Sequence, residues 1–181
     1  CCAQDFATVY NSAWAQHGEA KEITLDEVKK LFKTMKPIMD ERVIWFAYYK
    51  TEPIAMFINI PDVNQYFKHF NGKLNLVNKL RLLWMKKTGQ CKKLTGLAFG
   101  VVPKYQALGI DSYLIQACGY NMQHKGWYDA YEMGWAGDWN PIMVNIYKSL
   151  GASQNRRMVT YRFVFDEAKN PFERHPIMEY K

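Results

Sequence analysis

Long apolar runs, paired cysteines and clustered histidines are all missing from this 181-residue sequence. No apolar stretch approaches the roughly 18 residues that a membrane-spanning helix needs, so no span is expected. The four cysteines form no Cys-x-x-Cys pair and are too sparse for a disulfide scaffold, which favours a reducing, cytoplasmic setting. The four histidines are dispersed without ligand spacing, and we therefore expect no metal site.

Glycine and proline are also scarce, at 11 and 7 residues, which excludes collagen-like and low-complexity chains. The hydrophobic share of 49% excludes a disordered segment. A chain of this length can bury roughly 70% of its extended surface. Without repeats or an obvious linker, the sequence predicts a single domain over residues 1–181.

The chain is basic, with a formal charge of +7. Such a balance favours a polyanionic partner: nucleic acid, an anionic surface or a phosphate-rich cofactor. The positive residues are spread along the chain, notably over 29–36 and 79–93. We interpret most of them as solvated helix faces. No RNP-type aromatic and basic signature is present, so nucleic acid is not an expected partner.

Hydrophobic periodicity and turn residues predict strands and helices in mixed order. Thr24, followed three residues later by Glu27, forms a capping box that begins a helix ending near Met35. Asn140 and Pro141 begin another, which ends before Gly151. Further helices are predicted over 4–15, 74–86 and from 110 onward, and strands over 43–49, 53–60, 94–102, 128–135 and 159–165. This order favours an α+β or mixed α/β sheet with helices packed on it.

Residues 101–111 are the most informative segment, because a strand ends, a turn containing Gly109 follows and a helix begins. The first amides of a helix have no intrahelical partner and carry the positive end of its dipole. Such amides form a ready cradle for a pyrophosphate. The alternative is that Gly109 only allows a tight turn and has no role in binding.

Two motifs resemble those of the GNAT (Gcn5-related N-acetyltransferase) superfamily. Gln106-x-x-Gly109-x-Asp111 is similar to its acyl-CoA pyrophosphate motif, and Asn140, Tyr147 and Gly151 are spaced like its later Asn…Tyr-x-x-x-Gly helix. The resemblance implies a GNAT-like fold, with a central twisted mixed sheet and a splayed strand pair.

A closer resemblance is to bacterial GNAT-like proteins that often carry an additional N-terminal domain. The shared residues are Pro61, Asp62, Asn64, Glu132, Trp135, Asp138, Met143, Tyr161 and Arg162. The resemblance covers the chain essentially end to end and implies that it is the C-terminal part of a longer protein, which agrees with its start at Cys1.

The resemblance implies acetyl-CoA as acyl donor and assigns its contacts. The implied cofactor-binding residues are Gly100, Val101, Val102, Gln106, Ala107, Leu108, Gly109, Ile110, Asp111 and Asn140. Tyr147 matches the general acid that protonates the leaving thiolate, and Glu132 is the candidate base or water relay, with Asp138 second. The alternatives are a plain N-cap for Asn140, a packed aromatic for Tyr147 and a solvated edge charge for Glu132.

Asp111 departs from the superfamily pattern, in which that position is Gly or Ala. A carboxylate that pointed inward would repel a pyrophosphate. Asp in a first helical turn is also favoured by the helix dipole, so we expect it to point outward.

We therefore predict an N-acetyltransferase that moves an acetyl group from acetyl-CoA to a primary amine by direct attack in a ternary complex. The alternative is a non-catalytic acyl-CoA-binding or protein-interaction module of the same fold. The expected partner is a small-molecule or peptide amine, with no membrane or nucleic acid involved; a homodimer is left open.

Overall fold

The computed structural model describes residues 2–14, 22–161, 163 and 165. These belong to two compact units, Cys1–Gly134 and Trp135–Lys181.

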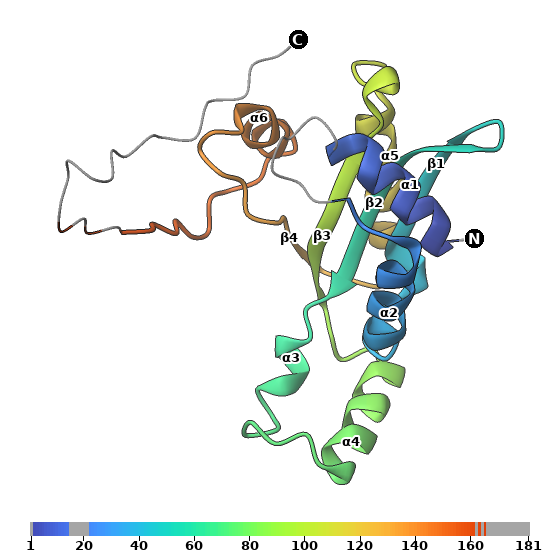
Figure 1. The fold of residues 1–181 in the computed structure, drawn as a ribbon. Coiled ribbons are helices and arrows are strands. Elements are labelled where there is room, and N and C mark those ends of the chain that lie inside the picture. The colour runs from blue at the N-terminus through green and yellow to red at the C-terminus, as the bar shows by residue number, and fades with distance from the viewer. Residues whose placement is uncertain (1, 15–21, 162, 164, 166–181) are drawn as a thin grey trace. The chain divides into compact units, whose positions relative to one another are not determined.

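The first unit is built on a four-stranded mixed sheet with the order β1-β2-β3-β4 (Figure 1). Antiparallel pairing joins β1 to β2 and β2 to β3, whereas β3 and β4 run parallel. The strands are β1 (Ile44–Tyr49), β2 (Glu52–Pro61), β3 (Lys93–Val101) and β4 (Ala130–Glu132). The predicted hairpin between the first two strands is confirmed; Lys50 adopts a left-handed φ of 56° in its turn.

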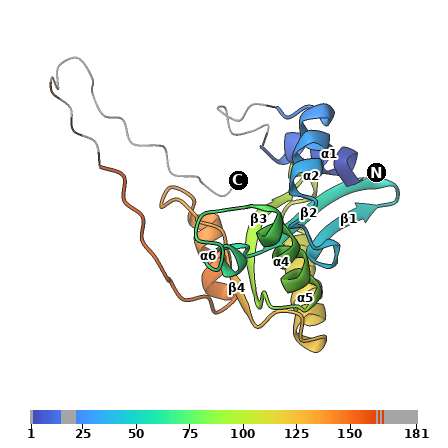
Figure 2. The ribbon, with the colours of Figure 1, turned by 90° about the horizontal axis from the view of Figure 1, so that it is seen from below.

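Helices cover both faces of this sheet (Figures 1 and 2). Since side chains alternate along a strand, β2 supplies both cores. Met56 and Ile58 pack under α1 (Cys2–Trp14) and α2 (Leu25–Met35). Phe57 packs on the other face under α5 (Ile110–His124). The result is a three-layer unit whose central strand is β2.

The start of α2 confirms the predicted capping box. The Thr24 hydroxyl accepts from the Glu27 amide at 3.3 Å, and the Glu27 carboxylate accepts from the Thr24 amide at 2.8 Å. The Asn11 side chain joins α1 to this start, because it donates to the Ile23 carbonyl and accepts from the Ile23 amide.

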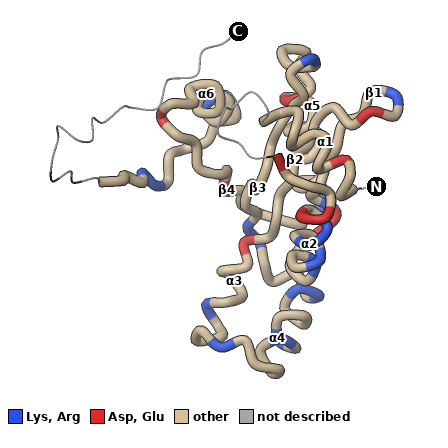
Figure 3. The backbone as a smooth tube through the Cα atoms, in the orientation of Figure 1, with Lys and Arg blue, Asp and Glu red and all other residues tan. Residues whose placement is uncertain are grey.

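A separate small core lies below the sheet in Figure 1, where α3 (Asn64–Phe67) and α4 (Leu76–Lys87) meet. Its buried members are Tyr66, Phe70, Leu82, Met85 and Cys91. The pKa of Tyr66 is raised to about 12 by this burial. Figure 3 shows that the segment carries Lys and Arg without Asp or Glu between residues 63 and 93.

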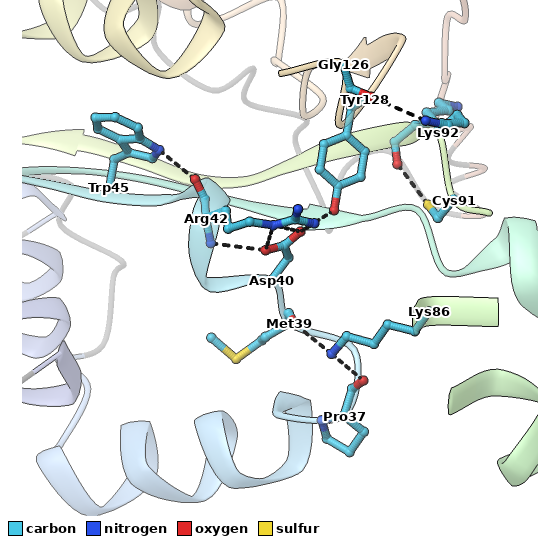
Figure 4. Close-up of polar contacts among 11 residues, drawn as sticks. Pro37, Met39, Asp40, Arg42, Trp45, Lys86, Cys91, Lys92, Gly126 and Tyr128 are labelled. Carbon is cyan, nitrogen blue, oxygen red and sulfur yellow. Dashed lines mark hydrogen bonds and ion pairs between the residues drawn. The ribbon is translucent and has the colours of Figure 1, made fainter. Parts of the chain in front are cut away.

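A polar network joins the short helix η1 (Glu41–Val43) to the segment that leads into β4 (Figure 4). The Asp40 carboxylate accepts from the Arg42 guanidinium and from the Tyr128 hydroxyl, both at 2.6 Å. The Arg42 guanidinium also lies 4.5 Å above the Trp127 ring. Nearby, Lys86 Nζ donates to the Pro37 and Met39 carbonyls and fastens α4 to the end of α2.

The second unit contains α6 (Pro141–Ser149), which begins at its predicted cap. The Asn140 side chain accepts from the Met143 amide at 3.1 Å, and Gly151 has the left-handed φ of 74° that suits a helix end.

Two predicted strands need correction. The strand predicted over 128–135 is limited to Ala130–Glu132. The strand predicted over 159–165 is wrong for the described residues of that stretch, which form no strand and are exposed. No helix among the described residues is long and apolar enough to cross a membrane.

Candidate functional site

The edge of β3 opens after its first three residues. On one side, β3 pairs with β2 from Leu94 to Val101. On the other side it pairs with β4 only at Lys93, Leu94 and Thr95. Among the described residues, the stretch from Gly96 to Val101 therefore has no strand partner on this second side. This is the splayed strand pair that the resemblance to the GNAT superfamily implies.

Gly96 and Gly100 each accommodate a ring that a side chain would displace. A Cβ on Gly96 would lie 2.6 Å from the Tyr131 hydroxyl and 3.3 Å from the Gly134 amide nitrogen. A Cβ on Gly100 would lie 2.6 Å from the Trp14 ring of α1. Gly96 thus allows close approach at the point where the strands part, whereas Gly100 allows close packing of a helix on the sheet.

Beyond β3, the chain turns through the short helix η2 (Pro103–Tyr105) and a left-handed loop into α5. Ala107 and Gly109 have φ values of 59° and 76°. The first intrahelical bond of α5 runs from the Tyr113 amide to the Gly109 carbonyl at 3.0 Å. The amides of residues 110–112 precede that bond, and no side chain caps this helix start. The structure thus contains the uncapped amides on which the predicted pyrophosphate cradle depends.

Three hydrogen bonds hold this loop against the sheet. The Val102 amide donates to the Ile54 carbonyl at 2.9 Å, and the Tyr105 hydroxyl donates to the Glu52 carboxylate at 3.1 Å. The Gln106 side chain donates to the Val101 carbonyl at 3.1 Å. Gln106, which the motif predicts as a cofactor contact, therefore fixes the loop onto the end of β3.

The Asp111 side chain leaves the loop amides free. It is half-buried in the first turn of α5, and among the described residues its carboxylate makes no hydrogen bond to the amides of 107–110. Leu108, at the tip of the loop, is 67% exposed. The loop amides are therefore open to a ligand.

A charged cluster lies at the other end of the open edge, where β2 ends and β3 and β4 begin. Lys93 forms ion pairs with Glu132 and, at 3.5 Å, with Asp62. The hydrogen bond to Glu132 is the main cause that raises the pKa of Lys93. The sequence singled out Asp62 and Glu132 but missed Lys93, because the three residues belong to different elements. Glu132, the predicted base, can accept a proton only by weakening this pair.

The remaining predicted residues belong to the second unit. Asn140 acts there as the N-cap of α6, which was its alternative interpretation. Tyr147 is half-buried on α6, and burial raises the pKa of its hydroxyl. The first unit therefore holds residues 100–102, 106–111 and Glu132, and the second holds Asn140 and Tyr147. Within the described part of the chain, no group of three or more His, Cys, Asp or Glu could hold a metal ion.

Similarity to curated proteins is distant but extends over most of this chain. No protein-family model matches it. A bacterial ceramide synthase from Caulobacter vibrioides is 26% identical over 168 residues, which cover 91% of this chain and 43% of that protein. Protein YghO from Escherichia coli K12 is 25% identical over 157 residues, covering 84% and 40%. The chain thus spans about two fifths of the length of these relatives.

Solved structures agree on the fold. An apo aminoglycoside antibiotic 6′-N-acetyltransferase from Acinetobacter haemolyticus superposes with a TM-score of 0.52 at 16% identity, covering 90% of this chain and 92% of that one. A possible acetyltransferase from Clostridium difficile 630 gives 0.56 at 17%, covering 90% and 91%. The chain has a GNAT-like α+β fold. In the GNAT-like fold of this chain, the open edge of β3 leads directly to the uncapped start of α5.

Proposed function

We propose that the chain is an acyl-CoA-dependent N-acyltransferase domain. The observation that carries the proposal is the parting of β3 from β4 after three residue pairs, followed directly by the uncapped start of α5. Open strand edges bind extended amide-containing groups through backbone hydrogen bonds, and uncapped helix starts bind phosphates. An acyl-CoA carries both groups in this order, with a pantetheine arm attached to a pyrophosphate.

Two sets of residues would bind the two parts of the acyl-CoA. The amides of 107–112 would hold the pyrophosphate, and the exposed edge from Gly96 to Val101 would pair with the pantetheine amides. The thioester would then lie near Gly96, where the strands part. Six residues of a strand cover about 20 Å at roughly 3.3 Å each, which gives room for an extended arm.

The chemistry is a direct transfer. A neutral amine attacks the thioester carbonyl carbon, the tetrahedral oxyanion collapses with cleavage of the carbon–sulfur bond, and the thiolate takes a proton. Tyr147 is the proposed donor of that proton, because it matches the general-acid position that the resemblance implies and its hydroxyl is protonated at neutral pH. Burial raises the pKa of this hydroxyl, so it gives up the proton only to a strongly basic group such as the leaving thiolate. Glu132 is the proposed acceptor of the proton that the amine loses, with Lys93 restraining its carboxylate.

The acyl donor has two candidates. Acetyl-CoA is the donor that the resemblance implies, and the structural neighbour AAC(6′)-Iy was solved with the bisubstrate analogue CoA-S-monomethyl-acetylneamine. A longer acyl-CoA is favoured by the relative described as a bacterial ceramide synthase, since a ceramide is the amide of a long-chain amine and a fatty acid. Both candidates share the transfer of an acyl group to an amine nitrogen.

Thermal unfolding with acetyl-CoA, palmitoyl-CoA and free CoA tests donor binding. A ligand at a hundredfold excess over its dissociation constant adds about 2.7 kcal/mol, which raises the midpoint by several degrees in a chain of this size. The acyl-CoA that gives the larger shift identifies the donor. If no acyl-CoA shifts the transition, the proposal fails.

Thiol release over a panel of short and long-chain amines then separates an enzyme from a binding module. Turnover with any amine supports the transferase. Tight acyl-CoA binding without turnover on any amine supports the non-catalytic module, which the Glu132–Lys93 ion pair favours by engaging the candidate base.

A further inference from the structure

The net positive charge of the chain is accounted for by one segment. Residues 63–93 contain eight Lys or Arg and no Asp or Glu, a formal charge of +8 against +7 for the full chain. The rest of the chain is therefore close to neutral. This segment comprises α3, α4 and the turns around them (Figure 3). Six of its basic residues are exposed: Lys68, Lys73, Lys79, Arg81, Lys87 and Lys92.

The same segment presents an apolar stripe to solvent. Leu76, Leu80, Leu83 and Trp84 occupy positions i, i+4, i+7 and i+8 of α4, so they share one face. They are 73%, 61%, 55% and 59% exposed, and Val77 beside them is 70% exposed. Leu82 and Met85 on the opposite face of the helix fill the small core with α3. The stripe residues are therefore not part of the core that α4 forms with α3.

Charge and apolar surface are arranged together on this helix. By helical spacing, Lys79 and Arg81 fall on the two opposite borders of the stripe, and Lys87 ends it. The exposed surface of α4 thus combines an apolar stripe with Lys and Arg at its borders, and this combination binds membrane interfaces. The face opposite the stripe packs in the small core instead of being polar. At 12 residues, or about 18 Å, α4 is far too short to cross a bilayer.

We propose that the exposed face of α4, with the basic residues around it, docks on an anionic lipid bilayer. The charge selects this occupant, because lysine is depleted from protein–protein interfaces while an anionic leaflet attracts clustered Lys and Arg. A nucleic acid would satisfy the cations, but its phosphates would leave the leucines without an apolar partner. Only a surface with anionic headgroups above acyl chains matches both features. This proposal departs from the expectation from sequence that no membrane is involved.

The docking surface is independent of the acyl-CoA site. Its stripe lies on α4, whereas the proposed donor contacts lie on β3 and at the start of α5. Lys86 fastens α4 to the carbonyls of Pro37 and Met39, so the helix is held to the body of the unit while the stripe faces outward. Membrane docking can therefore be measured without reference to catalysis.

Flotation with lipid vesicles tests the proposal on the full chain. The protein is expected to float with phosphatidylglycerol–phosphatidylcholine vesicles and not with pure phosphatidylcholine vesicles, and added salt should weaken the binding. The charge variant Lys79→Gln/Arg81→Gln/Lys87→Gln should lose roughly a hundredfold in partitioning, about fivefold per charge. The stripe variant Leu76→Ser/Leu80→Ser/Leu83→Ser should lose roughly tenfold or more, because three exposed leucines no longer enter the interface.

Matched variants on α2 serve as controls. Lys29→Gln/Lys30→Gln/Lys33→Gln removes the same number of exposed charges, and Leu31→Ser removes a leucine that is 38% exposed. Neither should change flotation more than about twofold. All variants alter exposed side chains, so thermal unfolding should be unchanged and any loss of binding cannot be assigned to misfolding.

Several outcomes would overturn the proposal. Absence of flotation, or equal flotation with neutral vesicles, removes the anionic bilayer as the occupant. Binding that needs the cations but not the leucines, together with salt-sensitive RNA binding, assigns the surface to nucleic acid. A self-associated chain that the stripe variant converts to monomer in light scattering assigns the stripe to contact between copies.

Discussion

Single residues decide whether the start of α5 can accept a phosphate. The chain places Ala107 and Gly109 at the two left-handed positions of the loop, and the missing side chain of Gly109 makes this conformation easy to adopt. Gln106 contributes through its side chain, which fixes the loop to Val101, rather than through an exposed donor. Asp111 is the one charged side chain in the first turn, and its effect can be measured directly.

Substitution Asp111→Asn is expected to tighten acyl-CoA binding at low ionic strength. The carboxylate does not occupy the loop amides, yet it adds a negative charge near the site of a pyrophosphate. Removing about 1 kcal/mol of repulsion lowers the dissociation constant about fivefold. The gain should fade at physiological salt, where exposed charges are screened beyond about 8 Å. Isothermal titration calorimetry measures both conditions.

Asp26→Asn is the control for this experiment, because Asp26 occupies the first turn of a different helix. It should leave acyl-CoA affinity unchanged. Equal affinity of the Asp111→Asn variant and the parent at every salt concentration would contradict an electrostatic effect of Asp111 on the site.

Gly100→Ala is expected to destabilise the first unit by about 1–3 kcal/mol, because an added methyl group overpacks the contact between β3 and α1. Its Cβ would lie 2.6 Å from the Trp14 ring and 3.1 Å from the Ala13 methyl group. Chemical denaturation measures the change. Gly119→Ala is the matched control: nothing lies within 4 Å of the new Cβ, and Ala in a helix interior stabilises by about 0.5–1 kcal/mol. A loss of stability in both variants would show that crowding by Trp14 is not the cause.

Tyr147→Phe tests the proposed general acid. The variant should bind acyl-CoA as the parent does but lose about a hundredfold in kcat, because the leaving thiolate no longer receives a positioned proton. Thiol release with the best amine of the panel measures the rate. An unchanged kcat would remove Tyr147 from the reaction and leave it as a packed aromatic of α6.

At the scale of elements, the Asp40 network fastens the segment before β1 to the segment before β4 (Figure 4). Burial alone would raise the pKa of Asp40, but hydrogen bonds from Arg42 and Tyr128 outweigh it and lower the pKa below its ordinary 3.8. A lowered carboxyl pKa stabilises the fold above the pKa of the unfolded chain. That stability is lost as the pH falls from about 3.8 through the lower pKa of the folded state.

Asp40→Asn should therefore flatten the acid limb of the stability profile below pH 3.8. At neutral pH, it should cost about 1–2 kcal/mol, because the charge-assisted bonds become neutral ones. Urea denaturation across this pH range measures both effects. An acid limb as steep in the variant as in the parent would place the responsible group elsewhere.

Local signals in the sequence predicted elements well and their partners poorly. The capping box at Thr24 and the cap at Asn140 were predictable because a cap is a contact within four residues. For the described residues of 159–165, alternation was misleading, since a strand also needs a partner strand, and no pattern within the segment identifies one. The ion pair between Lys93 and Glu132 could not be predicted from the sequence, because it depends on the register of β3 against β4.

The exposed stripe of α4 shows the same limit. Leucines at helical spacing predict a buried face, and Leu82 and Met85 do fill one. Only the structure shows that the remaining leucines are not needed for that core.

At the scale of the whole molecule, the hydrophobic core lies in the first unit, whereas the proposed site residues belong to both units. Every core residue among those described lies between Phe6 and Met122, within the first unit. The proposed donor contacts on β3 and α5 belong to this unit too, whereas α6 contains no buried residue and carries Tyr147. Folding and donor binding should therefore depend on the first unit, and proton donation on the second.

A chain truncated to residues 1–134 tests this division. It should remain folded with a cooperative thermal transition, because all three core clusters are kept. Acyl-CoA affinity should fall no more than about tenfold, since the loop amides and the open edge of β3 remain. Turnover should fall at least a hundredfold, because Tyr147 is removed. Circular dichroism, calorimetry and thiol release measure the three properties. A truncated chain that unfolds, or that loses acyl-CoA binding altogether, would show that residues 135–181 complete the core or the donor site.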